Sequence, residues 1–301
     1  MKADKPSSTA IFVANGLWWV ANNPRLRDEV PAAMAMTNRL MVQSVNRGIF
    51  SPDTRIGTIL LKIKTTLMQA VSVPGFYLHF VVRKRCIEAM VREAIEHGAE
   101  QLVVIGAGFD TLSLRIAADH PGIQVFEIDH PATRNWKIRA VADQKLNPGN
   151  VHFLALDLMR GTLKDTLLES PCYKPERTTV FVAEGLLMYL RESDVKDLLH
   201  FITHNSGQNS RFVFTYMEAQ APGDYQFKNA RWFVNFWLKI KSEMFTWGLQ
   251  SKNLGAFVEK SGMALLSIKT HSELRAEMLA PNHQQMPLAC GENVAVAETI
   301  K

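Results

Sequence analysis

Residues 102–111 read Leu-Val-Val-Ile-Gly-Ala-Gly-Phe-Asp-Thr, and this stretch decides the fold. Four apolar residues run into a Gly-x-Gly turn, a pattern typical of a fully buried strand that ends in a tight turn. Glycine lets the backbone of such a turn come close to a ligand, because no Cβ stands in the way. Residues 110–117 continue with helical apolar spacing, and Asp110 or Thr111 could cap that helix. A strand, a glycine turn and a helix form the first unit of a nucleotide-binding α/β fold.

The turn lacks the third glycine of the dinucleotide motif, because Phe109, Asp110 and Thr111 follow Gly108. A bound phosphate group needs open backbone amides at such a turn, and an acidic side chain would repel it. Asp110 therefore disfavours a dinucleotide and favours a ligand without phosphate. Gly-x-Gly also occurs in ordinary strand-to-helix turns, so further residues must identify a site.

The composition is that of an ordinary globular chain, with 47% hydrophobic and 21% charged residues among 301. This length fits one large α/β domain, or a domain with an appendage. The net charge of +5 is modestly basic, and the cations are dispersed apart from short runs such as Arg83-Lys84-Arg85. Dispersed cations indicate solvated faces, so no nucleic-acid partner is expected.

The three cysteines, Cys86, Cys172 and Cys290, lie far apart and have no metal-ligand spacing. This usage favours a reduced, cytoplasmic compartment, and no metal site is predicted. The apolar residues 9–21 are too few to span a bilayer. We interpret them as an N-terminal helix that packs on the domain, and no membrane partner is expected.

Helical patterns fill residues 9–98, and strands alternate with helical stretches after them. The longest helical pattern covers residues 80–97 and ends with Gly98 in the C′ position. Strands separated by helices predict a parallel sheet with right-handed crossovers and ligands at the carboxyl ends of the strands. The last two strands could pair antiparallel at the sheet edge, with a polar loop between them. The strands predicted after the first are residues 124–128, 151–155, 178–183, 211–216, 264–268 and 294–297.

Residues 218–262 are long for one connection and rich in aromatic side chains. Two interpretations are open, namely an inserted helical lid or substrate wall and packing against the N-terminal helices. The aromatic residues are Tyr225, Phe227, Trp232, Phe233, Phe236, Trp237, Phe245 and Trp247.

Acidic residues close three of the predicted strands, at Asp129, Asp157 and Glu184. In a parallel sheet these strand ends lie along one edge with Gly106. Asp129 could accept hydrogen bonds from ribose hydroxyls, Asp157 could bind the amino group of an adenine, and Glu184 could hold an ammonium group. S-adenosylmethionine carries a sulfonium, an ammonium, a ribose and an adenine, so it fits these acids better than a nicotinamide dinucleotide does.

The carboxylate of that ligand would need a cation. Arg83, at the start of the helix that precedes the first strand, is one candidate, and Arg85 is its competitor. Spacing alone does not choose between the two arginines.

Four short motifs follow one another between residues 80 and 216. They are Val-Val-Ile-Gly-Ala-Gly-Phe-Asp-Thr at 103–111, Phe-Glu-Ile-Asp-His-Pro at 126–131, Ala-Leu-Asp-Leu at 155–158 and Ala-Glu-Gly-Leu-Leu-Met-Tyr-Leu at 183–190. With these motifs in this order, the chain resembles the leucine carboxyl methyltransferase-like class I methyltransferases. The resemblance implies an α/β fold with a Rossmann-like doubly wound seven-stranded sheet. That sheet would be mostly parallel, with a reversed strand near the C-terminal edge, plus N-terminal helices and a helical insertion.

The resemblance also implies which residues contact S-adenosylmethionine. They are an arginine, a glycine, the acids that close two strands, a leucine, and the glutamate before a Gly-Leu-Leu run. In this chain these residues are Arg83, Gly106, Asp129, Asp157, Leu158 and Glu184.

Two parts are expected, an N-terminal helical cap at residues 1–98 and an S-adenosylmethionine-binding methyltransferase domain at residues 99–301. A helical insertion is expected at about residues 218–262. The acceptor would be a small molecule or peptide, methylated on a carboxylate or hydroxyl oxygen. The oligomeric state stays open.

A carboxylate acceptor is already ionised at neutral pH and needs no general base, which agrees with the absence of an obvious base in the sequence. A phenol or alcohol would benefit from a base, and His130 and Tyr189 are the nearest candidates. Two alternatives remain for the function. One is a cofactor-binding or protein-interaction module without turnover, and the other is a nicotinamide-dependent oxidoreductase.

Overall fold

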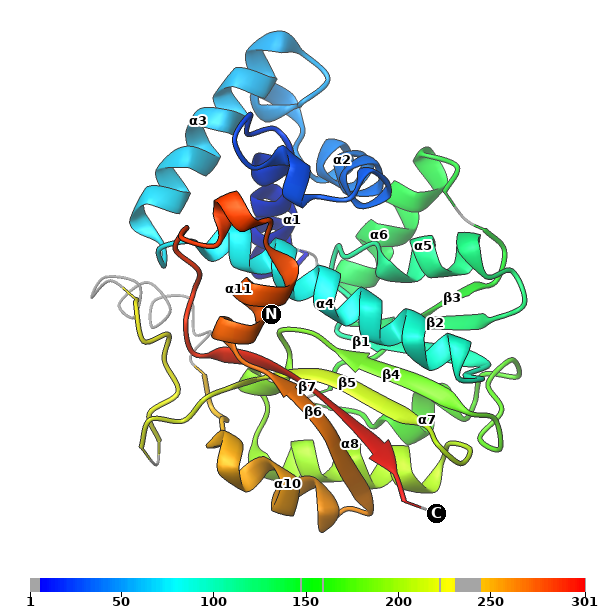
Figure 1. The fold of residues 1–301 in the computed structure, drawn as a ribbon. Coiled ribbons are helices and arrows are strands. Elements are labelled where there is room, and N and C mark those ends of the chain that lie inside the picture. The colour runs from blue at the N-terminus through cyan, green and yellow to red at the C-terminus, as the bar shows by residue number, and fades with distance from the viewer. Residues whose placement is uncertain (1–5, 147, 159, 222, 231–244, 301) are drawn as a thin grey trace.

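The computed structural model describes residues 6–146, 148–158, 160–221, 223–230 and 245–300 (Figure 1). Within them, a seven-stranded sheet has the order β3-β2-β1-β4-β5-β7-β6. Strand β7 is antiparallel to both of its neighbours, and the pairs among the first five strands are parallel. The predicted sheet with one reversed strand near the C-terminal edge is therefore confirmed. The strands are β1 (Gln101–Ile105), β2 (Gln124–Asp129), β3 (Val151–Ala155), β4 (Thr179–Ala183), β5 (Arg211–Met217), β6 (Met263–Lys269) and β7 (Glu292–Thr299).

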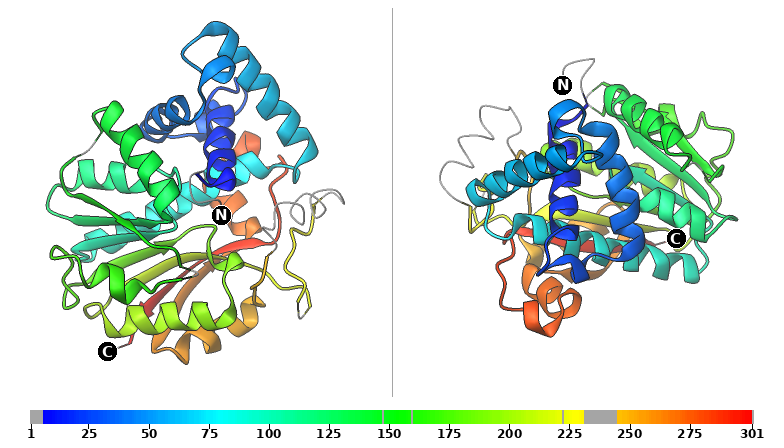
Figure 2. Two further views of the ribbon diagram at one scale, coloured as in Figure 1. Left: turned by 180° about the vertical axis from the view of Figure 1, so that it is seen from behind. Right: turned by 90° about the horizontal axis from the view of Figure 1, so that it is seen from above.

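The sheet is covered by helices on both faces, which explains the unbroken apolar run of its first strand (Figures 1 and 2). Leu102 and Val104 pack into the core cluster that includes α4, α5 and α6. Val103 and Ile105 point the other way, into the cluster with α7, α8 and α10. The helices are α1 (Ser8–Ala21), α2 (Ala32–Val45), α3 (Arg55–Val71), α4 (Phe76–Glu96), α5 (Leu112–Asp119), α6 (Pro131–Asp143), α7 (Leu163–Leu167), α8 (Glu192–His204), α10 (Ser251–Glu259) and α11 (His271–Met278).

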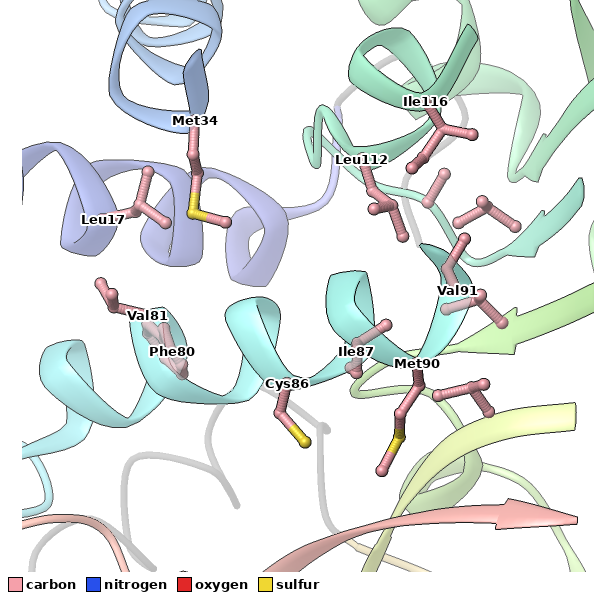
Figure 3. Close-up of a cluster of buried hydrophobic side chains, with 14 of the residues drawn as sticks. Leu17, Met34, Phe80, Val81, Cys86, Ile87, Met90, Val91, Leu112 and Ile116 are labelled. Atoms are coloured by element: carbon pink, nitrogen blue, oxygen red, sulfur yellow. The ribbon is translucent and has the colours of Figure 1, made fainter. Parts of the chain in front are cut away.

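Helix α4 lies between the sheet and the N-terminal helices. It contacts α1 on one side and β4, β5 and β7 on the other. Figure 3 shows Leu17 of α1 and Met34 of α2 on one side of α4, while Cys86 points from the other side toward the strands. Gly16 allows α1 to come this close, because a Cβ at that position would lie 2.5 Å from Cδ1 of Tyr77. The helix predicted at residues 9–21 thus packs on the domain, as expected.

The connection between β6 and β7 differs from the prediction. The polar loop predicted between the last two strands is wrong in part, because it contains α11. The hydroxyl and carboxylate of Thr270 and Glu273 form a capping box at the start of that helix, a signal the sequence carried. Residues 231–244 of the expected insertion, with four of its aromatic residues, lie outside the described residues.

The buried hydroxyl of Tyr77 provides a test of the packing between α1 and α4. Its ring packs against Phe12 at a centroid distance of 5.3 Å, but its oxygen has no hydrogen-bond partner among the described residues. Because an unpaired buried hydroxyl is unfavourable, Tyr77→Phe should leave the free energy of unfolding unchanged or raise it by about 1 kcal/mol. Urea denaturation measures this change.

Tyr216→Phe is the matched comparison, since that hydroxyl lies 2.8 Å from Oγ of Ser251 and 3.3 Å from Nδ2 of Asn293. Removing these bonds should lower the free energy of unfolding by about 1 kcal/mol. Equal losses in the two variants would show that the hydroxyl of Tyr77 is in fact paired.

Candidate active site

A cavity of about 1230 Å³ lies at the carboxyl ends of β1 to β4. Its wall contains the glycine turn after β1 and residues that follow β2, β3 and β4, together with side chains from α1 and α4. The strand ends predicted to meet at one edge of the sheet therefore do meet. All six residues carried over from the family lie in this wall: Arg83, Gly106, Asp129, Asp157, Leu158 and Glu184.

The glycine turn is hydrogen-bonded to the acid that closes β2. The backbone N–H of Gly108 donates to Oδ2 of Asp129 at 2.6 Å, and the N–H of His130 donates to Oδ1 at 2.7 Å. Gly106 has a φ of +68°, and a Cβ there would lie 3.1 Å from the side chain of Leu186. The turn thus needs glycine both for its backbone conformation and for its close packing.

Asp157 and Leu158 occupy the more open side of the cavity. The Asp157 carboxylate is partly exposed and lies 3.8 Å from Nε2 of His130 and 3.8 Å from Nε of Arg160. Leu158 packs against the core cluster on the far face of the sheet. This edge therefore offers a carboxylate that water or a ligand can reach, beside an apolar surface.

Buried ion pairs line the opposite side of the cavity. Nη2 of Arg83 lies 2.7 Å from Oε1 of Glu184, and Nη1 of Arg83 lies 2.6 Å from Oε2 of Glu292. Lys84 bonds the same Glu184 at 3.0 Å and also pairs with Asp110. We call these five residues the α4 ion network. The network contains two cations and three carboxylates, and these five side chains are almost completely buried.

The competing arginine points elsewhere. Nη1 of Arg85 lies 2.8 Å from Oε2 of Glu29 and 2.6 Å from the carbonyl oxygen of Met278, and Arg85 does not line the cavity. Of the two candidates for a cofactor carboxylate, the structure brings only Arg83 to the cavity wall.

The pKa values of the carboxylates in the network are shifted in opposite directions. Burial would raise the pKa of Glu292, but Arg83 and His79 outweigh burial and hold that pKa at about 2. Burial would likewise raise the pKa of Asp110, which Lys84 and Arg115 hold well below its usual range. Burial raises the pKa of Glu184 despite its two cations. Glu292 and Asp110 therefore remain ionised at neutral pH.

Three members of the network were not predicted as site residues. Lys84 lies within the short basic run, and the sequence indicates Asp110 only as a helix cap and as a charge that repels phosphate. The carboxylate of Asp110 accepts from the N–H of Leu112, the first residue of α5, at 2.9 Å, while Thr111 holds the N-cap position without a side-chain cap bond. Glu292 is the first residue of β7, and no local pattern connects it with Arg83. An acid just before the apolar run of residues 294–297 is the signal that could have drawn attention to it.

The remaining wall of the cavity is apolar and aromatic. Phe227 packs against Phe76 of α4 at a centroid distance of 5.0 Å and against Phe245 at 5.9 Å. Phe227 and Phe245 therefore line the cavity, and Phe227 also packs against a preceding helix. Trp247 does neither, because it packs against Phe257 of α10. Other apolar side chains in this wall are Phe12, Leu17, Met34, Met68, Phe80 and Met188.

The two candidate bases also line the cavity. Nδ1 of His130 accepts from the N–H of Ala132 at 3.2 Å, as a cap of α6, which leaves Nε2 directed toward Asp157. The ring of Tyr189 packs against Phe245 at a centroid distance of 5.5 Å. Each side chain thus has a structural role at the wall of the cavity.

Residues 21–203 match the family profile described as leucine carboxyl methyltransferase, which covers more than half of the chain. The chain belongs to the leucine carboxyl methyltransferase family. This membership confirms the resemblance drawn from the four motifs.

Proteins similar to this chain include a Mycobacterium tuberculosis protein described as a candidate S-adenosyl-L-methionine-dependent methyltransferase. It is 31% identical over 208 residues, which cover 69% of this chain and 56% of that protein. A Bacillus subtilis protein with the same description is 30% identical over 139 residues, covering 46% of this chain and 45% of the relative. The chain therefore spans about half the length of the curated relatives it matches.

A solved structure described as a candidate sarcosine dimethylglycine methyltransferase from Galdieria sulphuraria is also similar. It is 9% identical, with a TM-score of 0.50 over 76% of this chain and 93% of that chain. At this identity the likeness shows a shared class I methyltransferase fold.

The pairing of Glu292 with Arg83 leads to a prediction about acid stability. A carboxyl whose pKa falls from about 4.5 to about 2 on folding stabilises the native state above pH 4.5, and this contribution is lost as the pH falls toward 2. It amounts to about 3 kcal/mol at pH 7. The difference in unfolding free energy between wild type and Glu292→Gln should shrink by about 2 kcal/mol between pH 7 and pH 3.

Glu298→Gln is the control on the same strand, since Glu298 forms a partly exposed pair with Arg211 at 3.0 Å. Its cost should stay below about 1 kcal/mol. Urea denaturation at both pH values measures both variants. A pH-independent difference for Glu292→Gln would contradict the assigned pairing.

Proposed function

We propose that this chain is an S-adenosylmethionine-dependent methyltransferase that methylates a carboxylate or hydroxyl oxygen of an apolar small molecule or peptide. One observation carries the proposal. The glycine turn, the strand-end acids and the α4 ion network border a single cavity that continues into an apolar aromatic wall. Family membership and the descriptions of the two bacterial relatives support the same activity.

The proposed cofactor site has an adenosine end and an amino-acid end. At the adenosine end, Asp129 would accept from the ribose hydroxyls and Asp157 from the adenine amino group, with Leu158 against the base. Gly106 has no Cβ, so a ligand could lie close to the backbone of this turn. The absence of a third glycine and the ionised Asp110 support a ligand without phosphate.

At the amino-acid end, the α4 ion network offers both signs of charge. Arg83 would bind the carboxylate of the cofactor, and Glu184 would bind its ammonium group. Both side chains border the cavity and are already held in place by buried partners. A zwitterionic group therefore meets a preorganised surface of complementary charge.

The size and lining of the cavity support an apolar acceptor beside the cofactor. Pockets for one small ligand commonly measure about 300–1,000 Å³, and this cavity is larger, at about 1230 Å³. Phe76, Phe80 and Phe227 give the remaining space an aromatic wall. An acceptor with an apolar body and one polar end would match that wall.

When bound, S-adenosylmethionine would supply an electrophilic methyl group for an in-line displacement. The protein's part is to hold the acceptor oxygen at about 3–3.5 Å from that carbon and to exclude water. A carboxylate, with a pKa of about 4, arrives ionised and needs no base. For a hydroxyl acceptor, His130 or Tyr189 would take the proton.

Cofactor binding tests the adenosine end of the site. Asp129→Ala removes the acceptor of the ribose hydroxyls, so affinity for S-adenosylmethionine and S-adenosylhomocysteine should fall by roughly tenfold to a hundredfold. Isothermal calorimetry measures the affinity, and a urea melt checks that the variant is folded. NAD should not bind.

Asp143→Ala is the matched control, because Asp143 is exposed at the end of the neighbouring helix α6. Its affinity for the cofactor should equal that of wild type. Undiminished binding by Asp129→Ala would overturn the proposed site, and preferential binding of NAD would favour an oxidoreductase.

The acceptor is tested by the formation of S-adenosylhomocysteine from apolar carboxylic acids and apolar alcohols or phenols. With a carboxylate acceptor, the rate should be flat between about pH 6 and pH 9, and His130→Ala should keep that flat profile. A rate that rises with pH and depends on His130 would assign a hydroxyl acceptor. A protein that binds the cofactor but produces nothing from either class would favour a binding module.

A further inference from the structure

Helix α3 carries large apolar side chains on its outer face. They recur at intervals of three and four residues, which places them on one side of the helix. Their exposed fractions range from 49% to 72%. We call them the outer stripe: Ile56, Ile59, Ile63, Leu67 and Val71.

The other face of α3 is the one that packs on the protein. Gly57, Leu61 and Thr65 are buried there, and α3 contacts α1 and the short helix η2 (Gly48–Phe50). Figures 1 and 2 show α3 at the outer edge of the molecule, outside α1 and away from the sheet. A helix with one apolar face in the core does not need a second apolar face, so the outer stripe requires its own explanation.

Cations flank the outer stripe on both sides. Lys62 and Lys64 stand directly before and after Ile63, and successive residues of a helix turn by about 100°. The two lysines therefore lie on opposite borders of the stripe, and both are exposed. Residues 54–71 contain three cations and no acidic residue.

The charge of the whole chain follows the same division. Residues 6–75 contain seven lysines and arginines against three acidic residues, a net +4 out of the chain's +5. Residues 76–301 contain 25 of each sign and are neutral. The excess positive charge thus belongs to the part of the chain that carries the outer stripe, an asymmetry typical of proteins that bind an anionic surface.

A second copy of the chain fits this face poorly. A twofold antiparallel pairing of two α3 helices centred on Ile63 would place Lys62 of one copy beside Lys64 of the other. A parallel pairing would place each cation beside its equivalent. Since α3 has no acidic residue to offset them, both arrangements bring like charges together.

We propose that α3 docks the protein on an anionic membrane surface. The outer stripe would enter the headgroup region, while Lys62 and Lys64 would extend to the lipid phosphates. An apolar face bordered by cations is the arrangement that lies in a membrane interface. This proposal does not depend on the proposed methyl transfer.

Docking differs from spanning. Among the described residues, no single helix is long and apolar enough to cross a membrane. Helices α3 and α4 meet that criterion together, but they meet at 94° and α4 is buried in the domain. The short apolar segment at residues 9–21 predicts no membrane partner, and the proposal departs from that prediction because of the exposed apolar side chains of α3.

The outer stripe also leads to the cavity. Val71, at the end of the stripe, is 49% exposed and lines the cavity together with Met68. An apolar compound dissolved in the membrane would therefore meet the rim of the cavity without crossing bulk water.

Flotation with lipid vesicles tests the docking. The full chain should bind vesicles of phosphatidylcholine mixed with phosphatidylglycerol, and bind vesicles of phosphatidylcholine alone more weakly. Both the double variant Ile59→Ser with Ile63→Ser and the double variant Lys62→Glu with Lys64→Glu should lower partitioning by about tenfold or more. Unchanged affinity for S-adenosylhomocysteine, or unchanged urea melts, would show that the variants are folded.

Lys252→Glu with Lys260→Glu is the matched charge control, since both lysines are exposed at α10 on the other side of the sheet (Figure 1). This control should bind vesicles as wild type does. Three outcomes would overturn the proposal. In the first, the wild-type chain does not bind the mixed vesicles. In the second, the α10 control loses as much partitioning as the α3 variants. In the third, the wild-type chain is a dimer and the isoleucine double variant is a monomer.

Discussion

Two adjacent cations buried on one helix constrain the site. Arg83 and Lys84 occupy consecutive positions of α4, where both are almost closed to water. A buried charge without a partner costs several kcal/mol, so carboxylates must reach them from other elements. Asp110 comes from the turn after β1, Glu184 from the end of β4 and Glu292 from the start of β7. The ion pairs therefore hold three parts of the sheet edge around one helix.

The strand-end residues of the site could be predicted from the sequence. Buried strands have recognisable apolar runs, and parallel topology places their carboxyl ends along one edge. Gly106, Asp129 and Asp157 then follow directly from where each run stops. The choice of Arg83 over Arg85 could not be made in this way. It depends on which face of α4 is directed toward the sheet and which toward α1, and the packing of the core determines this orientation.

Ion pairs between residues far apart in the sequence could not be predicted, for a similar reason. Glu292 lies 209 residues from Arg83, and it precedes the residues at which an apolar pattern reveals the last strand. Periodicity also finds the residues that share a face of a helix without showing whether another element covers that face. The outer stripe of α3 and the buried side of α4 have the same kind of spacing. Only the assembled fold separates the exposed face from the core face.

The direction of β7 has a consequence for how the site is completed. Because β7 runs opposite to β5 and β6, its first residue lies at the edge where the parallel strands finish. Strand β7 lies between β5 and β6, so Glu292 reaches Arg83 only when β7 is paired in the sheet. The Arg83 guanidinium therefore takes its second carboxylate from the strand that comes after all the other described strands in the sequence. The wall of the cavity at Arg83 is in this way complete only when β7 pairs with its two neighbours.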